Sequence, residues 1–586
     1  MAGIKEKLVL WLSCVQCLAF LLPNHYSPWY SAHQEMGAAF AFVPLCIWAA
    51  FQSVRLPFLA LVAASLAVVP IVQLGFELVH FASDAWMATL YLFGFAFAVL
   101  AGSVCVRDDK TMVPELNFST ITRPWVGIVL AAILSVGIQL YQWLLLGDRG
   151  IYVAELPPNY RPFGNLAQPN QLATMLLFAL AGIIFLFEGR RISARIALAS
   201  AGLLAVGLVM TGSRSALLTL VWLLLAFLVF RRRCHLQTSV AAVVSITVFY
   251  TVASLSWSAI DQWLMIGNDT GIALVRAGDA GVRQVIWRSM ADAIMRSPWA
   301  GYGWGQIGSA QTAVTLDYPP TFAFFDSSHN LALDLALWNG LPIAFVVLVC
   351  LGSWFAWQIY CCRDGYSWSV LMAVGAVFTH AMVEFPLNYS YFLLPTGLLM
   401  GVLSAKNPLP LHPLLMLGKS HFPLIRAACV ASGMFALGVL LIVATEYWAF
   451  EDDWQLMRFQ EQRIGSFEKT PPPPAIVLTG LREFMRFSRT EPLPGMSKQD
   501  IDWMRRVSER YAYASPMFRY ALAQALNADS QGAQLTLRRL CHMQTPGACT
   551  SAKQQWTELQ QDRWPQLAST PFPVTDASKD GINFRQ

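Results

Sequence analysis

A short polar stretch, Asp326-Ser327-Ser328-His329-Asn330, separates a long polar connection from a strongly apolar run. Because it borders the apolar run, we expect His329 to lie at a membrane surface, where its imidazole can accept a proton near neutral pH. The connection that this stretch closes also carries Arg283 and Arg288. A base close to fixed cations predicts chemistry on an anionic, membrane-borne substrate.

A second cation, Arg214, stands in the turn Thr211-Gly212-Ser213-Arg214-Ser215 between two apolar runs. An arginine at membrane depth is costly and usually faces a partner or a polar cavity. Its planar guanidinium can hold a phosphate through two parallel hydrogen bonds. We therefore expect Arg214 to bind substrate, and the alternative is an anchor that reaches the headgroups. Arg283 and Trp287 are four residues apart and share one helix face, whereas Arg288 points elsewhere.

Residues 161–171 form a third polar segment, in which four side-chain amides fall within seven residues. An amide donates and accepts hydrogen bonds, which suits hydroxyl-rich sugars. The alternative is a helix cap with its loop amides facing water. Together with residues near His329 and after the 367–383 run, this segment supplies the candidates for donor or acceptor contacts: Arg161, Asn165, Gln168, Asn170, Gln171, Arg288, Asp326, Asn330, Glu384 and Tyr389.

The composition indicates what kind of protein must position these residues. It is 56% hydrophobic and only 13% charged, against about 25% charged residues in soluble domains. We therefore predict an all-α, polytopic membrane protein. The basic residues stand in short clusters, so the net charge of +5 does not indicate a nucleic-acid partner. Eleven cysteines show no metal-ligand spacing, and no DxD-like carboxylate pair in the outer loops marks a metal-dependent transferase.

A helix needs about 20 mostly apolar residues to cross a bilayer, and we predict 12 to 14 such spans. The first run has no small-residue cleavage site after it, so we interpret it as a retained span instead of a signal peptide. The predicted spans lie near residues 8–22, 37–53, 57–74, 85–105, 124–146, 171–187, 196–211, 215–230, 239–256, 330–360, 367–383, 389–404 and 424–446.

The basic residues fall in alternate connections, and the positive-inside rule places those connections in the cytoplasm. The loop 147–170, the turn at Arg214, the loop 257–329 and the chain after residue 446 then lie on the outer side. All candidate site residues share that side. The cytoplasmic set is Lys5, Lys7, Arg55, Arg107, Lys110, Arg190, Arg191, Arg195, Arg231, Arg232, Arg233, Arg363, Lys406, Lys419 and Arg426.

The chain after residue 446 is more polar, and we predict a membrane domain over 1–446 followed by a soluble helical domain over 447–586. The helical periodicity of residues 500–560 predicts short amphipathic helices, which look like a helical hairpin of the tetratricopeptide type. In an oxidising compartment, Cys541 and Cys549 can form a disulfide. The alternative is two unpaired thiols.

The motifs of residues 161–330 together resemble those of the O-antigen ligase and polymerase superfamily. The similarity lies in the Thr-Gly-Ser-Arg-Ser turn, in Gly281-x-Arg283-x-x-x-Trp287 followed by Pro298-x-x-Gly301-x-Gly303, and in His329-Asn330. The phrase Gly164-Asn-Leu-Ala-Gln-Pro-Asn-Gln-Leu-Ala173 is similar to the PglL-type branch of protein O-oligosaccharyltransferases, which includes pilin glycosylation ligases.

The resemblance implies a GT-C-like membrane glycosyltransferase of the bacterial inner membrane with a periplasmic active site and a periplasmic tail. It implies an undecaprenyl-pyrophosphate-linked glycan as donor, a Ser or Thr hydroxyl of a periplasmic protein such as pilin as acceptor, and no cofactor or metal. By motif position, it assigns catalysis to Arg214, Arg283 and His329. The arginines would stabilise the departing pyrophosphate, and His329 would act as the base.

Two other functions are compatible with parts of the sequence. An O-antigen ligase or polymerase would use the same donor with lipid A core or a growing chain as acceptor. The 161–171 phrase and the soluble tail disfavour it. A secondary transporter would be expected to place charges near the midplane, often in related halves, and neither feature is evident in the sequence.

Overall fold

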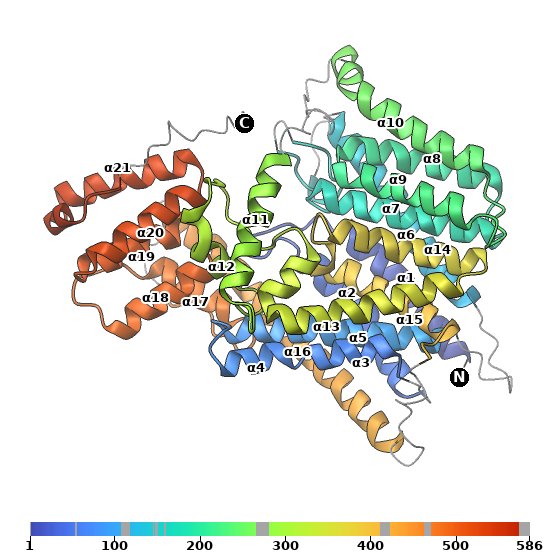
Figure 1. The fold of residues 1–586 in the computed structure, drawn as a ribbon, viewed down its shortest axis with the longest axis horizontal. Coiled ribbons are helices and arrows are strands. Elements are labelled where there is room, and N and C mark those ends of the chain that lie inside the picture. Colours follow the sequence, from blue (N-terminus) through green and yellow to red (C-terminus); the bar gives the residue numbers. More distant parts are fainter. Residues whose placement is uncertain are drawn as a thin grey trace.

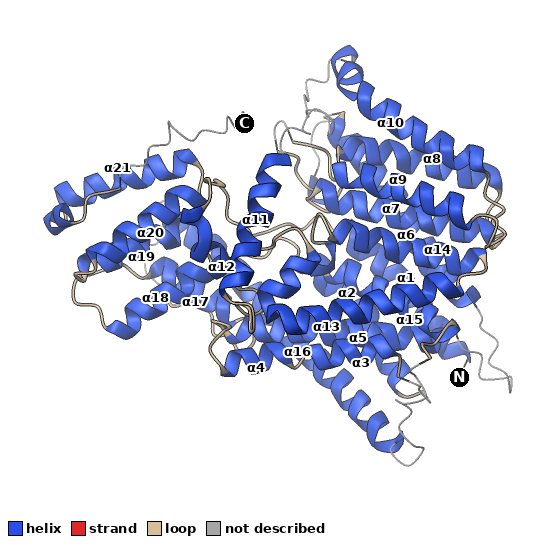
Figure 2. Cartoon of the chain, viewed as in Figure 1, coloured by secondary structure: helices blue, strands red, loops and turns tan. Residues whose placement is uncertain are grey.

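The computed structural model describes residues 2–573, apart from 53–55, 107–117, 145, 147–149, 158–159, 265–279, 411–421 and 462–469. Its regular secondary structure over these residues is helical throughout (Figure 2). The prediction of an all-α polytopic membrane protein is therefore confirmed. The predicted cytoplasmic residues Arg55, Arg107, Lys110 and Lys419 lie outside the described residues.

Every predicted span is helical in the structure. The 57–74 run is divided into two helices, because the second begins anew with Pro70 in its first turn. The bundle helices are α1 (Ala2–Leu21), α2 (Ala32–Ala50), α3 (Phe58–Leu66), α4 (Val69–Gly75), α5 (Ala82–Cys105), α6 (Thr122–Trp143), α7 (Pro169–Glu188), α8 (Ala194–Thr211), α9 (Arg214–Phe230), α10 (Val240–Trp263), α13 (Leu331–Cys361), α14 (Gly365–Ala381), α15 (Ser390–Lys406) and α16 (Phe422–Glu461).

Eight segments of the described chain are long and apolar enough to cross a membrane by themselves, with α3 and α4 counted as one. The predicted 12 to 14 spans include further helices of the same bundle. Of these, α9, α14 and α15 have 17 residues each, and α1 carries Lys5, Glu6 and Lys7 near its start. The total number of crossings stays a prediction.

Close backbone contacts hold the bundle together. A Cβ atom on Gly102 of α5 would lie 1.9 Å from the Leu398 carbonyl oxygen of α15, and one on Gly401 would lie 1.9 Å from the Val99 oxygen. Lipid is as apolar as the side chains, so helices in a bilayer associate largely through van der Waals packing. Small residues at such crossings allow the backbones to approach closely enough for this packing. Helix α7 is the most deeply buried candidate span, with 83% of its apolar window inside the structure. It therefore supplies a rigid support for the segment 161–171, which leads into it.

The connections between the bundle helices lie at two opposite ends of the bundle. At one end, Arg233 donates to the Tyr360 carbonyl, and the backbone N–H of Gln237 donates to Glu188 at 3.0 Å. This end carries described basic residues that were predicted to be cytoplasmic, among them Arg233 and Lys406, which pairs with Asp364. The other end gathers the turn at Arg214, the segment 161–171 and the connection between α14 and α15. The alternation of polar connections along the sequence thus corresponds to two ends in space.

The long connection before α13 contains α11 (Ala280–Arg296) and α12 (Ile307–Val314), which lie between the bundle and the tail (Figure 1). The glycine-rich turn after α11 packs on a kink in α13 at Gly340, where φ is +75°. The N–H groups of Tyr302 and Leu341 donate to the carbonyls of Leu337 and Pro298, both at 2.7 Å. The turn therefore supports the first half of α13, directly after His329.

Helix α16 continues to Glu461, so the predicted domain boundary at residue 446 falls inside a helix. The tail is helical, as predicted, and its tetratricopeptide character stays a prediction. A disulfide joins Cys541 and Cys549, with 4.9 Å between the Cα atoms. The tail helices are α17 (Thr479–Arg489), α18 (Lys498–Arg510), α19 (Ala514–Leu526), α20 (Ser530–Met543) and α21 (Pro546–Asp562). Short 3-10 helices are η1 (Phe118–Ile121), η2 (Gly150–Tyr152), η4 (Thr315–Asp317), η5 (Pro386–Asn388) and η8 (Pro565–Ser569).

Candidate active site

The carboxylate of Glu384, between α14 and α15, is the centre of a buried polar cluster. The Arg283 guanidinium and the Asn170 amide donate to Oε1, the amide at 2.9 Å. The His329 Nδ1 atom lies 3.3 Å from Oε2. The Glu384 side chain is only 5% exposed, so it depends on these partners to remain charged. Four segments that are far apart in the sequence therefore meet at one carboxylate.

The charge state of Glu384 follows from these contacts. Burial by itself raises the pKa of this carboxyl, but the hydrogen bond with His329 and the nearby charges of His329 and Arg283 outweigh burial and lower it. Glu384 is therefore ionised at neutral pH. An ionised carboxylate at Nδ1 favours the imidazole tautomer that carries its proton on Nδ1, which leaves Nε2 as the proton acceptor.

The backbone of the loop before α13 fixes the position of His329. His329 has a φ of +57°, a left-handed conformation that is uncommon for a residue with a side chain. Asp334 accepts hydrogen bonds from the Ser327 hydroxyl at 2.5 Å and from the Ser328 N–H at 2.7 Å. The Trp287 indole donates to the Ser328 carbonyl at 3.0 Å. These bonds stabilise a conformation that the loop would not adopt alone.

Helix α11 places its two candidate arginines in different surroundings. Arg283 is half-buried and contacts Glu384, and Trp287 on the same face holds the loop of His329. Arg288 is exposed and lies outside this cluster.

Part of the segment 161–171 reaches the cluster. Asn170 contacts Glu384, and Gln171 accepts a hydrogen bond from the Tyr391 hydroxyl at 2.6 Å. Gln168, Asn170 and Gln171 line a small pocket together with Glu384 and Tyr389. The amides at the end of the segment are thus beside the carboxylate.

Three other predicted residues use their polar side-chain atoms to bind backbone groups instead of Glu384. Asn165 is 1% exposed, and its amide bonds the backbone of Leu21, Tyr152 and Ala154. Arg161 donates to the carbonyls of Thr211 and Gly212 at 3.0 and 3.2 Å, at the end of α8. Asn330 caps α13 by accepting from the N–H groups of Ala332 and Leu333, and its amide donates to the Met382 carbonyl at 3.2 Å, two residues before Glu384. Each of these contacts fixes loop or helix-end geometry.

A second layer of polar residues, missed by the sequence analysis, lies below the cluster. His380 on α14 contacts the Ser215 hydroxyl at 2.6 Å and the Thr174 hydroxyl at 2.5 Å. The N–H of Glu384 donates to the His380 carbonyl at 2.8 Å. Arg214, the first residue of α9, is half-buried next to Ser215. A histidine inside an apolar run was the available signal, because intramembrane ionisable residues are usually functional.

A cavity of about 830 Å³ opens beside His329. Much of its lining is apolar, and α3, α5 and α13 contribute residues such as Leu59, Leu92 and Leu335. Its polar part includes Asp326 and Tyr389. A large apolar cavity that ends at a few fixed polar groups suits a ligand with a lipid part and a polar head.

No group of three or more His, Cys, Asp or Glu side chains that could hold a metal ion occurs in the described part of the chain. The polar groups at the site are cations, a carboxylate, imidazoles and amides. This set can bind an anion, accept a proton and orient a hydroxyl group.

Comparisons with known proteins find three family models that match parts of this chain. A family model described as O-antigen ligase matches residues 199–348, and one described as protein glycosylation ligase matches residues 162–187. A third, described as the C-terminal part of a virulence factor membrane-bound polymerase, matches residues 368–548.

Two relatives come from Acinetobacter baylyi. The general O-oligosaccharyltransferase is 27% identical over 549 residues, which cover 91% of this chain and 92% of the relative. The ComP-specific O-oligosaccharyltransferase is 30% identical over 260 residues, 42% of this chain and 45% of the relative. The chain is thus similar to the O-antigen ligase superfamily of membrane proteins and, within it, to protein O-oligosaccharyltransferases of the PglL type.

Proposed function

We propose that this protein transfers a preassembled glycan from undecaprenyl pyrophosphate to Ser or Thr hydroxyls of periplasmic proteins. The observation that carries the proposal is the cluster in which Glu384 holds His329 and Arg283 together beside a large apolar cavity. The names of the two relatives support glycan transfer to protein.

The donor would place its polyprenyl chain along the apolar lining and its two phosphates near the cluster. Arg283 pairs with Glu384 through one nitrogen, and its planar fork has further N–H donors for a phosphate. Arg214 is our second candidate, because its turn is connected to the cluster through Ser215 and His380. A well-placed donor in a low-dielectric site stabilises developing charge by roughly 3 to 4 kcal/mol.

The transfer step would be a direct displacement at the anomeric carbon. The acceptor oxygen forms a bond to that carbon while the bond from the carbon to the phosphate oxygen breaks. The electron pair leaves with the pyrophosphate, and the hydroxyl proton moves to His329 Nε2. Glu384 would position the imidazole and stabilise its protonated form. Attack opposite the leaving group inverts the anomeric configuration, and no metal or cofactor enters this step.

The amides beside Glu384 suit the orientation of an acceptor hydroxyl. Gln168 and Asn170 lie there within reach of the carboxylate, and amides can orient a hydroxyl by donating and accepting hydrogen bonds. We infer a protein acceptor, of which a pilin is one candidate. Ligation to lipid A core is the second candidate function, because the O-antigen ligase model matches residues 199–348.

A reconstituted assay tests the activity and separates the two acceptors. The purified protein would be given lipid-linked oligosaccharide with either a Ser-rich periplasmic protein or lipid A core, with and without EDTA. We expect glycosylated protein in both metal conditions. Transfer to lipid A core alone would replace the protein acceptor, and loss of transfer in EDTA would contradict metal independence.

We further infer that the site end of the bundle faces the periplasm of a bacterial inner membrane, on the basis of the positive-inside rule. Ser569→Cys in the tail and Arg232→Cys at the basic end are both exposed positions for labelling with an impermeant maleimide. The parent protein supplies the background from native thiols. After outer-membrane permeabilisation alone, only the Ser569→Cys variant should gain label, and the reverse pattern would invert the orientation.

A further inference from the structure

The turn between α18 and α19 of the tail reaches the cavity that His329 lines. Arg510, Tyr511 and Tyr513 belong to the lining of this cavity, together with Asp326. One wall of the candidate site is therefore built by the soluble tail.

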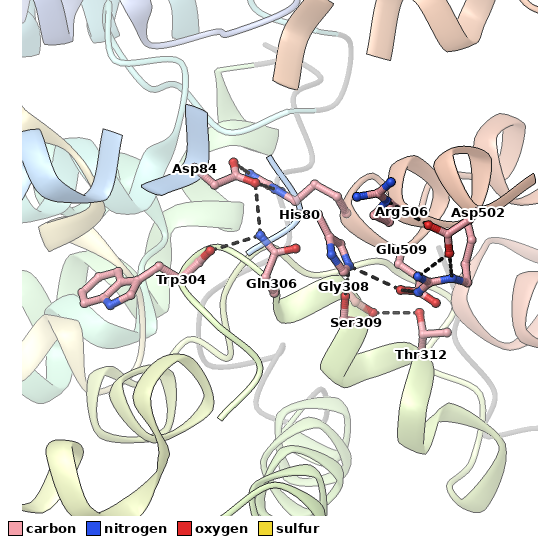
Figure 3. A network of polar contacts seen from close by, with 12 residues as sticks. His80, Asp84, Trp304, Gln306, Gly308, Ser309, Thr312, Asp502, Arg506 and Glu509 are labelled. Carbon is pink, nitrogen blue, oxygen red and sulfur yellow. Dashed lines mark hydrogen bonds and ion pairs between the residues drawn. The ribbon is translucent and has the colours of Figure 1, made fainter. Parts of the chain in front are cut away.

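An ion pair fixes this turn to the bundle. Arg510 donates through Nε and Nη2 to the two carboxylate oxygens of Asp84, at 2.9 and 3.1 Å, and Gln306 donates to the same carboxylate at 3.1 Å. Burial by itself lowers the pKa of Arg510, but the charge of Asp84 more than compensates and raises it. A bidentate pair of this kind sets orientation as well as position. Figure 3 shows Asp84 and Gln306 in this network.

A second contact fixes α18 against α12. His80 lies 3.2 Å from the Ser309 hydroxyl and 3.3 Å from the Glu509 carboxylate (Figure 3). A Cβ atom on Gly308 would lie 2.3 Å from the Glu509 carbonyl oxygen, so the two backbones are in direct contact. The turn at residues 510–513 is thus held from both sides.

The side chains that this arrangement leaves exposed at the cavity are aromatic and acidic. Tyr513 is 46% exposed, Tyr30 is 62% exposed and the Asp326 side chain is 65% exposed. Phe324 packs edge-on against Tyr513, with 5.0 Å between the ring centroids, which fixes the tyrosine ring. Exposed aromatic faces stack on the C–H faces of sugar rings, and a carboxylate accepts hydrogen bonds from sugar hydroxyls.

We propose that Tyr513, Tyr30 and Asp326 form a subsite for the sugars of the donor glycan that follow the sugar bound to pyrophosphate. The inference rests on the proposed function, because the reacting sugar must then lie near His329 with the lipid in the apolar part of the cavity. The remaining sugars have to leave along the polar part of the lining, where these three residues lie. The tail thereby takes part in selecting donors by glycan length.

The test compares two donors that differ only in the glycan. Transfer would be measured with undecaprenyl pyrophosphate carrying one N-acetylhexosamine and with the same lipid carrying a tetrasaccharide. The donor concentration is varied at saturating acceptor, and the acceptor concentration is varied at saturating donor. The variants are Tyr513→Ala, Tyr30→Ala and Tyr513→Phe, which keeps the ring. Tyr360→Ala is the matched control, since Tyr360 is 63% exposed at the basic end of the bundle.

We expect KM for the tetrasaccharide donor to rise about tenfold in the two alanine variants, equal to about 1.4 kcal/mol. Tyr513→Phe and the control should behave as wild type, and the monosaccharide donor should be unaffected throughout. Equal losses with both donors would overturn the subsite, and a rise in KM for the acceptor alone would assign these residues to the acceptor protein.

A binding measurement keeps the subsite separate from the proposed function. If wild-type protein transfers neither donor, the proposed function fails. Saturation-transfer NMR with the free tetrasaccharide then tests the subsite alone. We expect the signal of wild-type protein to be lost in Tyr513→Ala and kept in Tyr360→Ala. A signal that is absent from wild type, or unchanged in Tyr513→Ala, would overturn the subsite.

Discussion

Two clusters in this protein combine a glutamate with an arginine and a histidine. Glu384 contacts Arg283 and His329. Glu509 contacts Arg505 at 2.9 Å and His80 at 3.3 Å. In both glutamates burial by itself raises the pKa, and the hydrogen-bonded histidine and the arginine charge lower it overall. The residue types and the local electrostatics are therefore nearly the same.

The surroundings of the two clusters differ. His329 lines the cavity of about 830 Å³ and is held in a left-handed conformation by its loop. His80 also contacts Ser309 and lies between the bundle connection, α12 and α18, which it joins. The same three residue types thus fit catalysis in one place and domain docking in the other. The comparison teaches that access to a ligand-sized cavity separates the two roles.

The sharpest test of this comparison is the loss of each histidine. His329→Ala should lower glycan transfer by about 10²- to 10⁴-fold, since it removes the proposed base. His80→Ala should lower it less than about threefold, because Arg505 still pairs with Glu509. Transfer rates and thermal unfolding would be measured for both variants in detergent. Similar losses of transfer at equal stability would end the distinction between the clusters.

The next largest effect is expected at Arg283. Arg283→Ala should cost about 10²- to 10³-fold in transfer and weaken donor binding, because a charge-stabilising donor is lost. Arg283→Lys should recover only part of this loss, since an ammonium cannot form the bidentate fork. Gln284→Ala, an exposed neighbour on the same helix, serves as control. Full activity of the lysine variant would show that charge alone is needed.

Glu384→Gln tests whether the carboxylate positions the His329 imidazole, because glutamine has nearly the same side-chain shape as glutamate. We expect roughly 10²-fold slower transfer at unchanged donor KM, since the imidazole loses the carboxylate that orients it and stabilises its charge. The pH dependence of kcat should also change, because the substitution removes a negative charge in contact with the proposed base. Glu509→Gln should leave the pH profile of kcat as in wild type. An unchanged profile in Glu384→Gln would contradict the positioning role.

The smallest effect concerns stability in acid. The lowered pKa of Glu509 means that its ionised form stabilises the folded state above the ordinary glutamate pKa of about 4.3. This contribution is lost as the pH falls through the lower, folded-state pKa. Wild type should therefore lose unfolding temperature from about pH 5 downward, and Glu509→Gln should lose less. Parallel curves for the two proteins would exclude a docking role for this charge.

The candidate site shows how far local patterns can predict. The motif positions of His329 and Arg283 indicated two residues that the structure brings to one carboxylate. The four-residue spacing of Arg283 and Trp287 indicated a shared helix face, whereas the candidate Arg288 lies exposed outside the cluster. Glu384 was expected only as a contact for sugar or acceptor. Its central place depends on the packing of α14 against α7, which no sequence pattern expresses.

Long-range packing also explains the residues that local reasoning missed. Asn165 has the same amide chemistry as Asn170, but it is buried among backbone groups at the end of α1 and in the connection before α7, whereas Asn170 contacts Glu384. Arg510, Tyr511 and Tyr513 lie in a tail that the sequence separated from the membrane domain. Their place in the cavity wall depends on the pairing of Arg510 with Asp84.

The sequence by itself determined the helical class, the positions of the apolar helices and the alternation of polar connections. These properties follow from runs of apolar side chains and from charges near them, which act over a few turns of helix. Only the tertiary structure decided which polar groups share a cavity and which join two domains. That choice depends on helix packing and on ion pairs between residues hundreds of positions apart, so the Glu384 and Glu509 clusters differ in role although their chemistry is the same.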